Sequence, residues 1–438
     1  MHRFFTAIKH IFVIEELRTR ILNTIGFILI FRLGSFIALP GIDVTKLTGE
    51  VKGIFSLLDV FLGGAFSHVS IFALGVMPYI SASIAVQLLT VALPYFQKLQ
   101  KEGHSGRKRL NELTKILTIL LALIQSVSYL TVAVPDEVIM TNKLLFFIAS
   151  LAIIPAGTMA CTWIGDRITD RGLGNGISML IMIGIISSLP GSLYEEFIAR
   201  GNRGLLIFIL ELLILFLIVA SLVMFTKATR KIPLQYAKQM VTGGAYGGQR
   251  QYIPLKLNTA GVMPIIFAQV LMFLPTLLTN LLASKSNFAA GIAKIFADFT
   301  TWQYNAVFGV LIVVFTYFYT AITINPAQIA DDMKRNSGFI PGIRQGKPTA
   351  AFIDQILSRI TLPGSLFLAI IAILPGVAYL VGISRSFSRF YGGTSLLIMV
   401  GVVLDIVQQV ESYFLVHHYD YMMKSSRAQK QNKNMVVA

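Results

Sequence analysis

The chain has 438 residues, of which 55% are hydrophobic and 13% are charged, and its formal net charge is +16. This composition excludes an ordinary water-soluble globular protein, because such proteins carry about 25% charged residues. The single cysteine, Cys161, lies in an apolar stretch and excludes a disulfide framework.

Apolar stretches long enough to cross the hydrocarbon core of a bilayer, roughly 17–25 residues, recur along the chain. Ten are present, at residues 21–40, 77–97, 113–134, 143–164, 174–190, 205–225, 258–282, 304–325, 355–376 and 393–416. Before the first of them, residues 1–16 mix charged and apolar side chains and predict a short amphipathic helix on the membrane surface. The sequence therefore predicts an all-α membrane protein with ten transmembrane helices.

The distribution of basic residues predicts how these helices are oriented. Six alternate connecting segments, starting with the N-terminal one, together hold 25 Lys and Arg residues, whereas the five segments between them hold 8. Because basic residues collect on the cytoplasmic side of a membrane, both termini are predicted to be cytoplasmic, including the tail 417–438. The same residues predict attraction to anionic lipid.

Residues 41–76 connect the first two apolar stretches and are unusual for a connecting segment. They are too apolar for a solvated loop and too interrupted to span the membrane. A half-length helix folded back into a cavity fits this pattern, because irregular backbone persists at membrane depth only where protein or water covers it. A static segment at the membrane interface is the alternative.

Two long segments are predicted on the cytoplasmic side, at residues 226–257 and 326–352. The first holds six basic residues, no acidic residue and a glycine-rich centre at 243–248, which predicts a protruding β-hairpin. Such a protrusion suits an acidic partner, either a protein surface or RNA, although an ordinary basic cytoplasmic loop is the alternative. The second segment is also polar, but Asp331 and Asp332 balance its basic residues.

The chain contains an internal repeat. Residues 176–184 (GISMLIMIG) reappear as residues 393–401 (GTSLLIMVG), and residues 77–80 (MPYI) reappear as residues 263–266 (MPII). The spacing divides the chain into two related halves of five spans each, at 17–190 and 205–416. Because five is odd, the second half must be inverted in the membrane, as in proteins that move a cargo between the two sides.

The repeat aligns β-branched apolar residues from four spans at equivalent depths. They are Ile80 and Ile84 of the second span, Ile266 and Val270 of the seventh, Ile181 of the fifth and Ile398 of the tenth. A ring of such side chains makes a narrow constriction that sheds water and blocks ions without offering a polar binding site. For any single position, packing or contact with lipid is the alternative.

Features typical of solute carriers and of enzymes are missing from these motifs. No charged residue stands beside the repeated isoleucines, where a proton- or cation-coupled carrier normally places one. Residues 346–349 resemble the end of a phosphate-binding loop, but Pro341 replaces its first glycine and Pro348 its final Ser or Thr. The chain is therefore predicted to hydrolyse nothing, and neither a metal nor a cofactor is predicted. Polar residues that could form weak hydrogen bonds between the halves are Gln87, Thr90, Gln125 and Asn258.

Several motifs closely resemble those of the SecY family, the central subunits of the bacterial protein-conducting translocon. They are residues 62–67 (LGGAFS), 71–84 (IFALGVMPYISASI), 101–107 (KEGHSGR), 170–178 (DRGLGNGIS), 254–258 (PLKLN), 260–264 (AGVMP) and 342–344 (GIR). The motifs are long and specific, and the resemblance covers essentially the whole chain.

The resemblance implies the SecY/Sec61α fold, in which ten helices in two inverted halves surround an hourglass pore. It implies that Ile80, Ile84, Ile181, Ile266 and Ile398 form the pore ring, with Val270 at a neighbouring lining position. Residues 58–72 would be the plug that seals the external funnel, including Leu62, Gly63, Gly64, Ala65, Phe66 and Ser67. A lateral gate would lie between spans two and three on one side and seven and eight on the other.

The resemblance also implies partners and a location. These are SecE and SecG subunits, the SecA motor ATPase, translating ribosomes, signal peptides and nascent membrane proteins, with SecDF and YidC as further candidates, all at the bacterial cytoplasmic (inner) membrane. The candidate contacts for SecA or the ribosome are Lys238, Arg250, Lys256, Arg344 and Lys347. One departure is present at the tip of the 226–257 segment, where many bacterial members carry two adjacent basic residues and this chain has Gly243 and Gly244.

The predicted function is passive conduction of unfolded, signal-bearing polypeptides across the membrane, with lateral release of transmembrane segments. An external motor or the ribosome would supply the driving force. Two alternatives are a secondary solute transporter, which needs a polar midplane site, and a structural or insertase scaffold without a pore.

Overall fold

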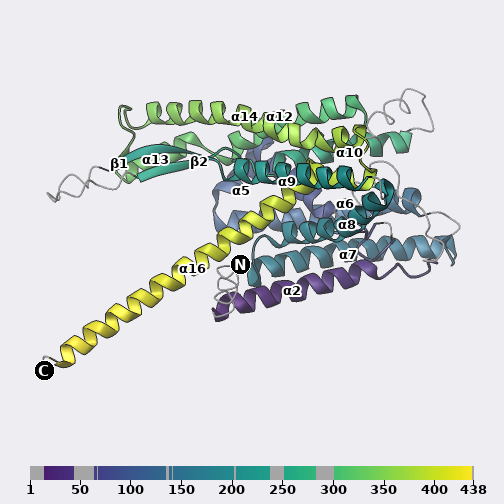
Figure 1. Cartoon of the computed structure of the whole chain (residues 1–438), viewed down its shortest axis with the longest axis horizontal. Helices are drawn as coiled ribbons and strands as arrows, with labels where there is room; N and C mark the ends of the chain where they lie inside the picture. Colours follow the sequence, from purple (N-terminus) through teal and green to yellow (C-terminus); the bar gives the residue numbers. More distant parts are fainter. Residues whose placement is uncertain are drawn as a thin grey trace.

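The structure is a computed structural model that describes residues 14–43, 64–66, 68–134, 138–140, 142–201, 204–236, 251–282 and 300–436. Most of its helices run side by side along one direction, and a small β-sheet lies at one end of the bundle (Figure 1). We call this the sheet end. The predicted helix at 1–16 falls almost entirely outside the described residues.

Each half of the predicted repeat is built from long helices. The first half contains α2 (Glu15–Phe36), α4 (Met77–Ala92), α5 (Pro94–Lys101), α6 (His104–Ala133), α7 (Lys143–Arg171) and α8 (Gly176–Arg200). The second half contains α9 (Leu205–Lys227), α10 (Met263–Leu282), α12 (Trp302–Thr323), α13 (Pro326–Arg335), α14 (Lys347–Leu380), α15 (Arg385–Ser388), the 3₁₀ turn η4 (Arg389–Tyr391) and α16 (Gly393–Val436).

Helices fit to cross a membrane dominate the described part of the chain. Eight of them are long and apolar enough on their own, and a bent pair, Met77–Thr90 with Pro94–Gln100, makes a ninth. The tenth predicted span corresponds to α10, of which Met263–Met272 stands out as a shorter apolar helix. All ten predicted spans therefore coincide with helices of the structure.

The predicted second span, 77–97, is not one straight helix. It breaks at Leu93, and the two parts are bent by 102°. Pro94 explains the break, because proline lacks the N–H that a continuing helix needs and favours an extended residue before it. Leu93 is extended, with φ −112° and ψ 125°. The short helix α5 then packs back against α6.

The two predicted cytoplasmic segments are joined in one three-stranded sheet. Strands β1 (Thr229–Tyr236) and β2 (Gln251–Lys256) pair antiparallel, which confirms the predicted hairpin. Strand β3 (Gly338–Phe339) pairs with the other edge of β1, so that the order is β2-β1-β3. Segment 326–352 is therefore ordered as α13, β3 and the first turns of α14, rather than being an extended polar loop. The predicted tail 417–438 continues α16, which projects well beyond the bundle (Figure 1).

The repeated motifs begin equivalent helices that run in opposite directions. Met77 begins α4 and Met263 begins α10, whereas Gly176 begins α8 and Gly393 begins α16. Helix α8 leads away from the sheet end toward α9, and α16 runs back past that end (Figure 1). The two halves are therefore inverted relative to each other.

Gly176 allows α7 and α8 to meet closely at the sheet end. A Cβ atom at this position would overlap the carbonyl oxygen of Gly165 and lie 2.8 Å from Cβ of Ile168. In contrast, a Cβ at Gly191 in the same helix would have no atom within 4 Å.

We expect Gly176→Ala to lower the free energy of unfolding by about 1–3 kcal/mol, because the added methyl group must push the helices apart. Gly191→Ala should be neutral or slightly stabilising, since alanine favours helix more than glycine does. Thermal unfolding of both variants in the same detergent checks this expectation. Equal unfolding midpoints would show that the close approach at Gly176 is unimportant.

Candidate functional site

Four of the repeated isoleucines occupy matched positions in the structure. Ile80 and Ile266 are each the fourth residue of their helices, and Ile181 and Ile398 are each the sixth. Asn175 fixes the start of α8, because its side-chain oxygen accepts hydrogen bonds from the N–H groups of Ile177 and Ser178.

These four isoleucines belong to one apolar cluster between the halves. Ile181 and Ile398 are buried members of it, and Ile80 and Ile266 are half-buried and pack against it. We call the four isoleucines the waist. The four side chains can exclude water, and they themselves offer no hydrogen bond or charge to hold a particular solute.

The other two predicted lining residues are placed differently. Ile84 is buried one turn after Ile80, and Val270 is half-buried one turn after Ile266. Neither is a member of the apolar clusters formed by the described residues. The structure therefore brings together four of the five predicted ring isoleucines, and the pore-ring role itself stays a prediction.

The described part of the predicted plug leads directly into the waist. Leu62, Gly63 and Ser67 lie outside the described residues, whereas Gly64, Ala65 and Phe66 begin a series of turns that ends where α4 starts. Further along, Phe72 and Val76 are buried members of the waist's apolar cluster. The ring of Phe72 stacks on that of Phe31, with centroids 6.0 Å apart, and lies close against Gly34 in α2.

Hydrogen bonds attach this segment to the end of α2 and to α6. The N–H of Leu39 donates to Val69 O at 2.9 Å, and the N–H of Ile71 donates to Ile37 O at 2.9 Å. The Tyr129 hydroxyl donates to Phe66 O at 2.7 Å. Sequence analysis did not anticipate these anchors. Of the residues that hold this segment, only Gly34 could have been recognised from the sequence, because a glycine inside an apolar helix permits the close approach of another part of the chain.

We expect Tyr129→Phe to loosen this segment while leaving the fold intact. The variant removes one buried hydrogen bond, which is worth about 1 kcal/mol, and leaves Phe66 O without its hydroxyl donor. The ring contact between Phe66 and residue 129, with centroids 4.5 Å apart, is retained. Amide hydrogen exchange of residues 64–72 should become faster in the variant, and unchanged exchange would show that the hydroxyl does not hold the segment.

The four polar residues predicted at a gate lie on or next to the helices predicted to form it, and both the gate and their role in it stay predictions. Gln87 donates to the Ser83 hydroxyl and Thr90 donates to Gln87 O, both within α4. Gln125 is half-buried on α6. Asn258 precedes α10, and its side-chain oxygen is buried without a hydrogen bond to the described residues. Helix α4 packs chiefly on α6 and α10 on α12, so each pair stays within its own half.

The basic residues predicted to contact a motor or ribosome are only partly described. Lys256 ends β2, and Arg344 and Lys347 flank the start of α14; all three are exposed at the sheet end. Lys238, Arg250, Gly243 and Gly244 lie outside the described residues.

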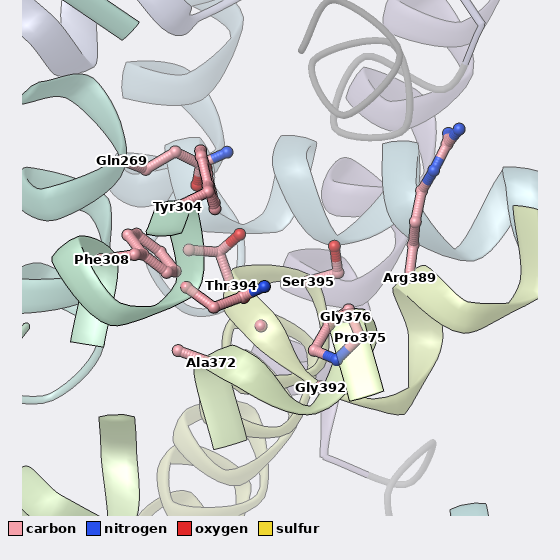
Figure 2. Close-up of a pocket in the computed structure, with 12 residues that line it drawn as sticks. Gln269, Tyr304, Phe308, Ala372, Pro375, Gly376, Arg389, Gly392, Thr394 and Ser395 are labelled. Atoms are coloured by element: carbon pink, nitrogen blue, oxygen red, sulfur yellow. The ribbon is translucent and has the colours of Figure 1, made fainter. Parts of the chain in front are cut away.

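A small pocket lies within the second half, and its lining residues Gln269 and Ser395 are one helical turn from Ile266 and Ile398. Its volume is about 50 Å³, and it lies between α10, α12, α14 and the start of α16 (Figure 2). Its lining is Gln269, Tyr304, Asn305, Phe308, Ala372, Pro375, Gly376, Arg389, Gly392, Gly393, Thr394 and Ser395. Pockets for small-molecule ligands have volumes of about 300–1,000 Å³, so this one suits only a few water molecules.

A buried ionic cluster at the end of the bundle opposite the sheet was missed by sequence analysis. It consists of Glu196, Arg200 and Glu211. Glu196 and Arg200 were assigned to the segment between the fifth and sixth spans, where charged residues are unremarkable. The structure instead extends α8 to Arg200, which brings both side chains into the packed bundle.

The fold and the waist define a class: a multi-pass helical membrane protein whose two inverted halves meet at an apolar cluster. The SecY family model matches residues 70–407. The protein translocase subunit SecY of Streptomyces scabiei is 39% identical over 444 residues, covering 96% of this chain and all of that protein. The SecY subunit of Mycobacterium tuberculosis is 38% identical over 432 residues, covering 93% and 97%. The chain belongs to the SecY family.

Solved structures confirm the predicted fold. A structure described as that of a protein-conducting channel superimposes with a TM-score of 0.66 at 16% identity, covering 90% of this chain and 92% of that one. Sec61 in a canine ribosome–channel complex from the endoplasmic reticulum gives a TM-score of 0.63 at 15% identity, with the same coverage.

Proposed function

We propose that this chain is the channel subunit of a protein translocase. It passes unfolded, signal-bearing polypeptides across a membrane and releases transmembrane segments sideways into lipid. The observation that carries the proposal is the waist, where four helices from both inverted halves each contribute an isoleucine to one apolar cluster. An apolar constriction suits cargo of arbitrary sequence, because it forms no strong bond with any particular side chain.

In this mechanism a signal peptide's apolar segment, stabilised by lipid, enters between α4 and α6 on one side and α10 and α12 on the other. Its entry separates the halves and displaces the plug segment from the waist. The isoleucines then close around the moving chain and limit ion leakage. The plug and gate roles are part of this proposal.

The partners we propose are SecE and SecG subunits, SecA and the ribosome. Two structural neighbours are channels bound to ribosomes, the canine Sec61 complex and the yeast Ssh1 complex, which supports a ribosome as one partner. The exposed residues Lys256, Arg344 and Lys347 at the sheet end supply positive charge for such a contact. We place the sheet end and both termini in the cytoplasm of a bacterium, with the chain in the cytoplasmic membrane, and assign ATP hydrolysis to SecA.

Reconstitution tests this function. The chain is placed in vesicles with SecE and SecG, and SecA, ATP and a preprotein are added. We expect the preprotein to become protected from external protease only when ATP and an intact signal sequence are present. Protection that does not depend on this chain would reject the proposal.

A scaffold without a pore is the second candidate, favoured by the hydrogen bonds that attach residues 64–76 to α2 and α6. Deletion of residues 60–70 separates the two functions. A channel should leak ions in a planar bilayer after this deletion, whereas a scaffold should leave the bilayer ion-tight.

A further inference from the structure

The small pocket of the second half surrounds the first residues of α16. Its lining includes four consecutive residues, 392–395, and its other walls come from α10, α12 and α14 (Figure 2). Ser395 stands three residues before Ile398, and Gln269 stands three residues after Ile266. The pocket therefore adjoins two of the four helices that form the waist.

The backbone at the start of α16 offers hydrogen-bond donors to this pocket. The first N–H groups of an α-helix have no acceptor within the helix. Of the described backbone oxygens outside α16, none accepts from the N–H of Gly393, Thr394 or Ser395. Gly392 and Gly393 have no side chains that could cover these groups. The N-terminus of a helix also carries a partial positive charge, about half an elementary charge, so this end of α16 attracts negative charge.

Two buried hydroxyl groups add to these donors. Thr394 and Ser395 are each 7% exposed and line the pocket, and their oxygens point to the same side in Figure 2. Neither hydroxyl has a hydrogen-bond partner among the residues that the structure describes. Hydroxyls further along a helix, such as those of Thr361 and Ser365, donate to a carbonyl oxygen of the preceding turn, but α16 has no turn before its second and third residues. Because a buried polar group without a partner is costly, the two hydroxyls indicate an occupant of the pocket.

The charges around the pocket favour an anion as this occupant. Arg389 contributes to the lining, and none of the described lining residues is acidic. Two buried carboxylates, Glu196 and Glu211, lie near Tyr391, but both are paired with Arg200 and neither lines the pocket. The pocket thus combines donors and positive charge without a carboxylate that would repel an anion.

We propose that this pocket binds one small monovalent anion, such as chloride. The donors are the N–H groups at the start of α16, the hydroxyls of Thr394 and Ser395 and the side-chain amide of Gln269. Helix N-termini bind anions for the same reasons in other proteins. A chloride ion is little larger than one of the few water molecules that a volume of about 50 Å³ can hold, whereas an organic anion such as gluconate is too large.

The bound anion would tie the start of α16 to α10. Ser395 and Gln269 each lie one helical turn from a waist isoleucine, Ile398 and Ile266 respectively. The anion therefore helps to position these two isoleucines against each other. This inference rests on the fold alone and does not depend on the proposed function.

Thermal unfolding of the full chain, purified with the subunits that accompany it and placed in lipid nanodiscs, tests the site. Sodium bromide replaces sodium gluconate stepwise at constant ionic strength and pH, so that general charge screening does not change. We expect the unfolding midpoint to rise with bromide and to level off as the site fills, because a ligand that binds only the folded state stabilises it. Anomalous scattering from bromide in crystals of the same complex should place the ion in the pocket.

The double variant Thr394→Val and Ser395→Ala removes both hydroxyls while leaving the backbone donors. It should weaken the apparent bromide affinity by roughly tenfold or more, because hydrogen bonds to an ion are stronger than those between neutral groups. Ser365→Ala is the matched control. It removes a buried hydroxyl of the same half that donates within α14, to Leu362 O, and should leave the bromide dependence unchanged.

Two results would overturn the proposal. The absence of a bromide signal in the wild-type pocket would show that only water fills it, and equal bromide dependence in wild type and the folded double variant would show that its hydroxyls hold no ion. A bromide signal without any rise of the unfolding midpoint would mark an adventitious ion only, which also overturns the proposal. If the double variant does not fold, the crystallographic result for wild type decides. Preprotein transport is measured separately, and its absence would reject the proposed function but leave the anion site standing.

Discussion

Replacing Ile80 and Ile398 together by Asn should make the idle channel leak ions. The two residues come from opposite halves and share the apolar cluster of the waist. Amide side chains would attract water into a cluster of apolar side chains. Each decrease of about 1.4 kcal/mol in the free-energy barrier to ion passage raises the rate of passage tenfold. We therefore expect the idle conductance, measured in planar bilayers, to rise by roughly tenfold or more.

The same variant should accept cargo with defective signal sequences, because its closed state is less favoured relative to its open state. Preprotein protection in vesicles measures this loss of selectivity. The double variant Ile80→Val and Ile398→Val keeps the waist apolar and serves as the control. Wild-type conductance and selectivity in a folded Asn variant would contradict the role of the waist.

Placing a carboxylate inside the three-stranded sheet should abolish docking of large partners while sparing the membrane part. Ile232 of β1 is 3% exposed and packs with Leu234, Leu255 and Met333 beneath the sheet. An unpaired buried charge at this position costs several kcal/mol, so Ile232→Asp should unfold the small sheet. We expect co-sedimentation with ribosomes, and stimulation of SecA ATPase activity, to fall to background.

Gln235→Asp is the matched control, because it adds the same charge at an exposed position of the same strand. It should weaken binding only slightly, through long-range repulsion that salt screens. Thermal unfolding of the membrane part should be the same in both variants. Retained ribosome binding by Ile232→Asp would show that the partners do not use the sheet.

The spans and the repeat could be predicted from the sequence because both depend on local pattern. A bilayer requires long apolar helices. The two copies of the repeated motif, which start at Gly176 and Gly393, each stand at the beginning of a helix in the structure. The four isoleucines of the waist could be predicted from the same internal repeat, which aligned Ile80 with Ile266 and Ile181 with Ile398.

The features that were missed depend on contacts between residues far apart in the chain. The pairing of β3 with β1 involves a strand of only two residues, Gly338–Phe339, which has no recognisable pattern. Glu196 and Arg200 become partners of Gly382 and Ser384 only through the packing of the halves. The break at Leu93 was predictable in principle, since Pro94 stood inside the predicted span 77–97, close to its end.

The order of the sheet has a mechanical consequence. Strand β1 continues from α9, β2 leads into α10, and β3 lies between α13 and α14, so every strand belongs to the second half. A force applied to this sheet would therefore act directly on the second half of the molecule and would reach the first half only through the contacts between the halves.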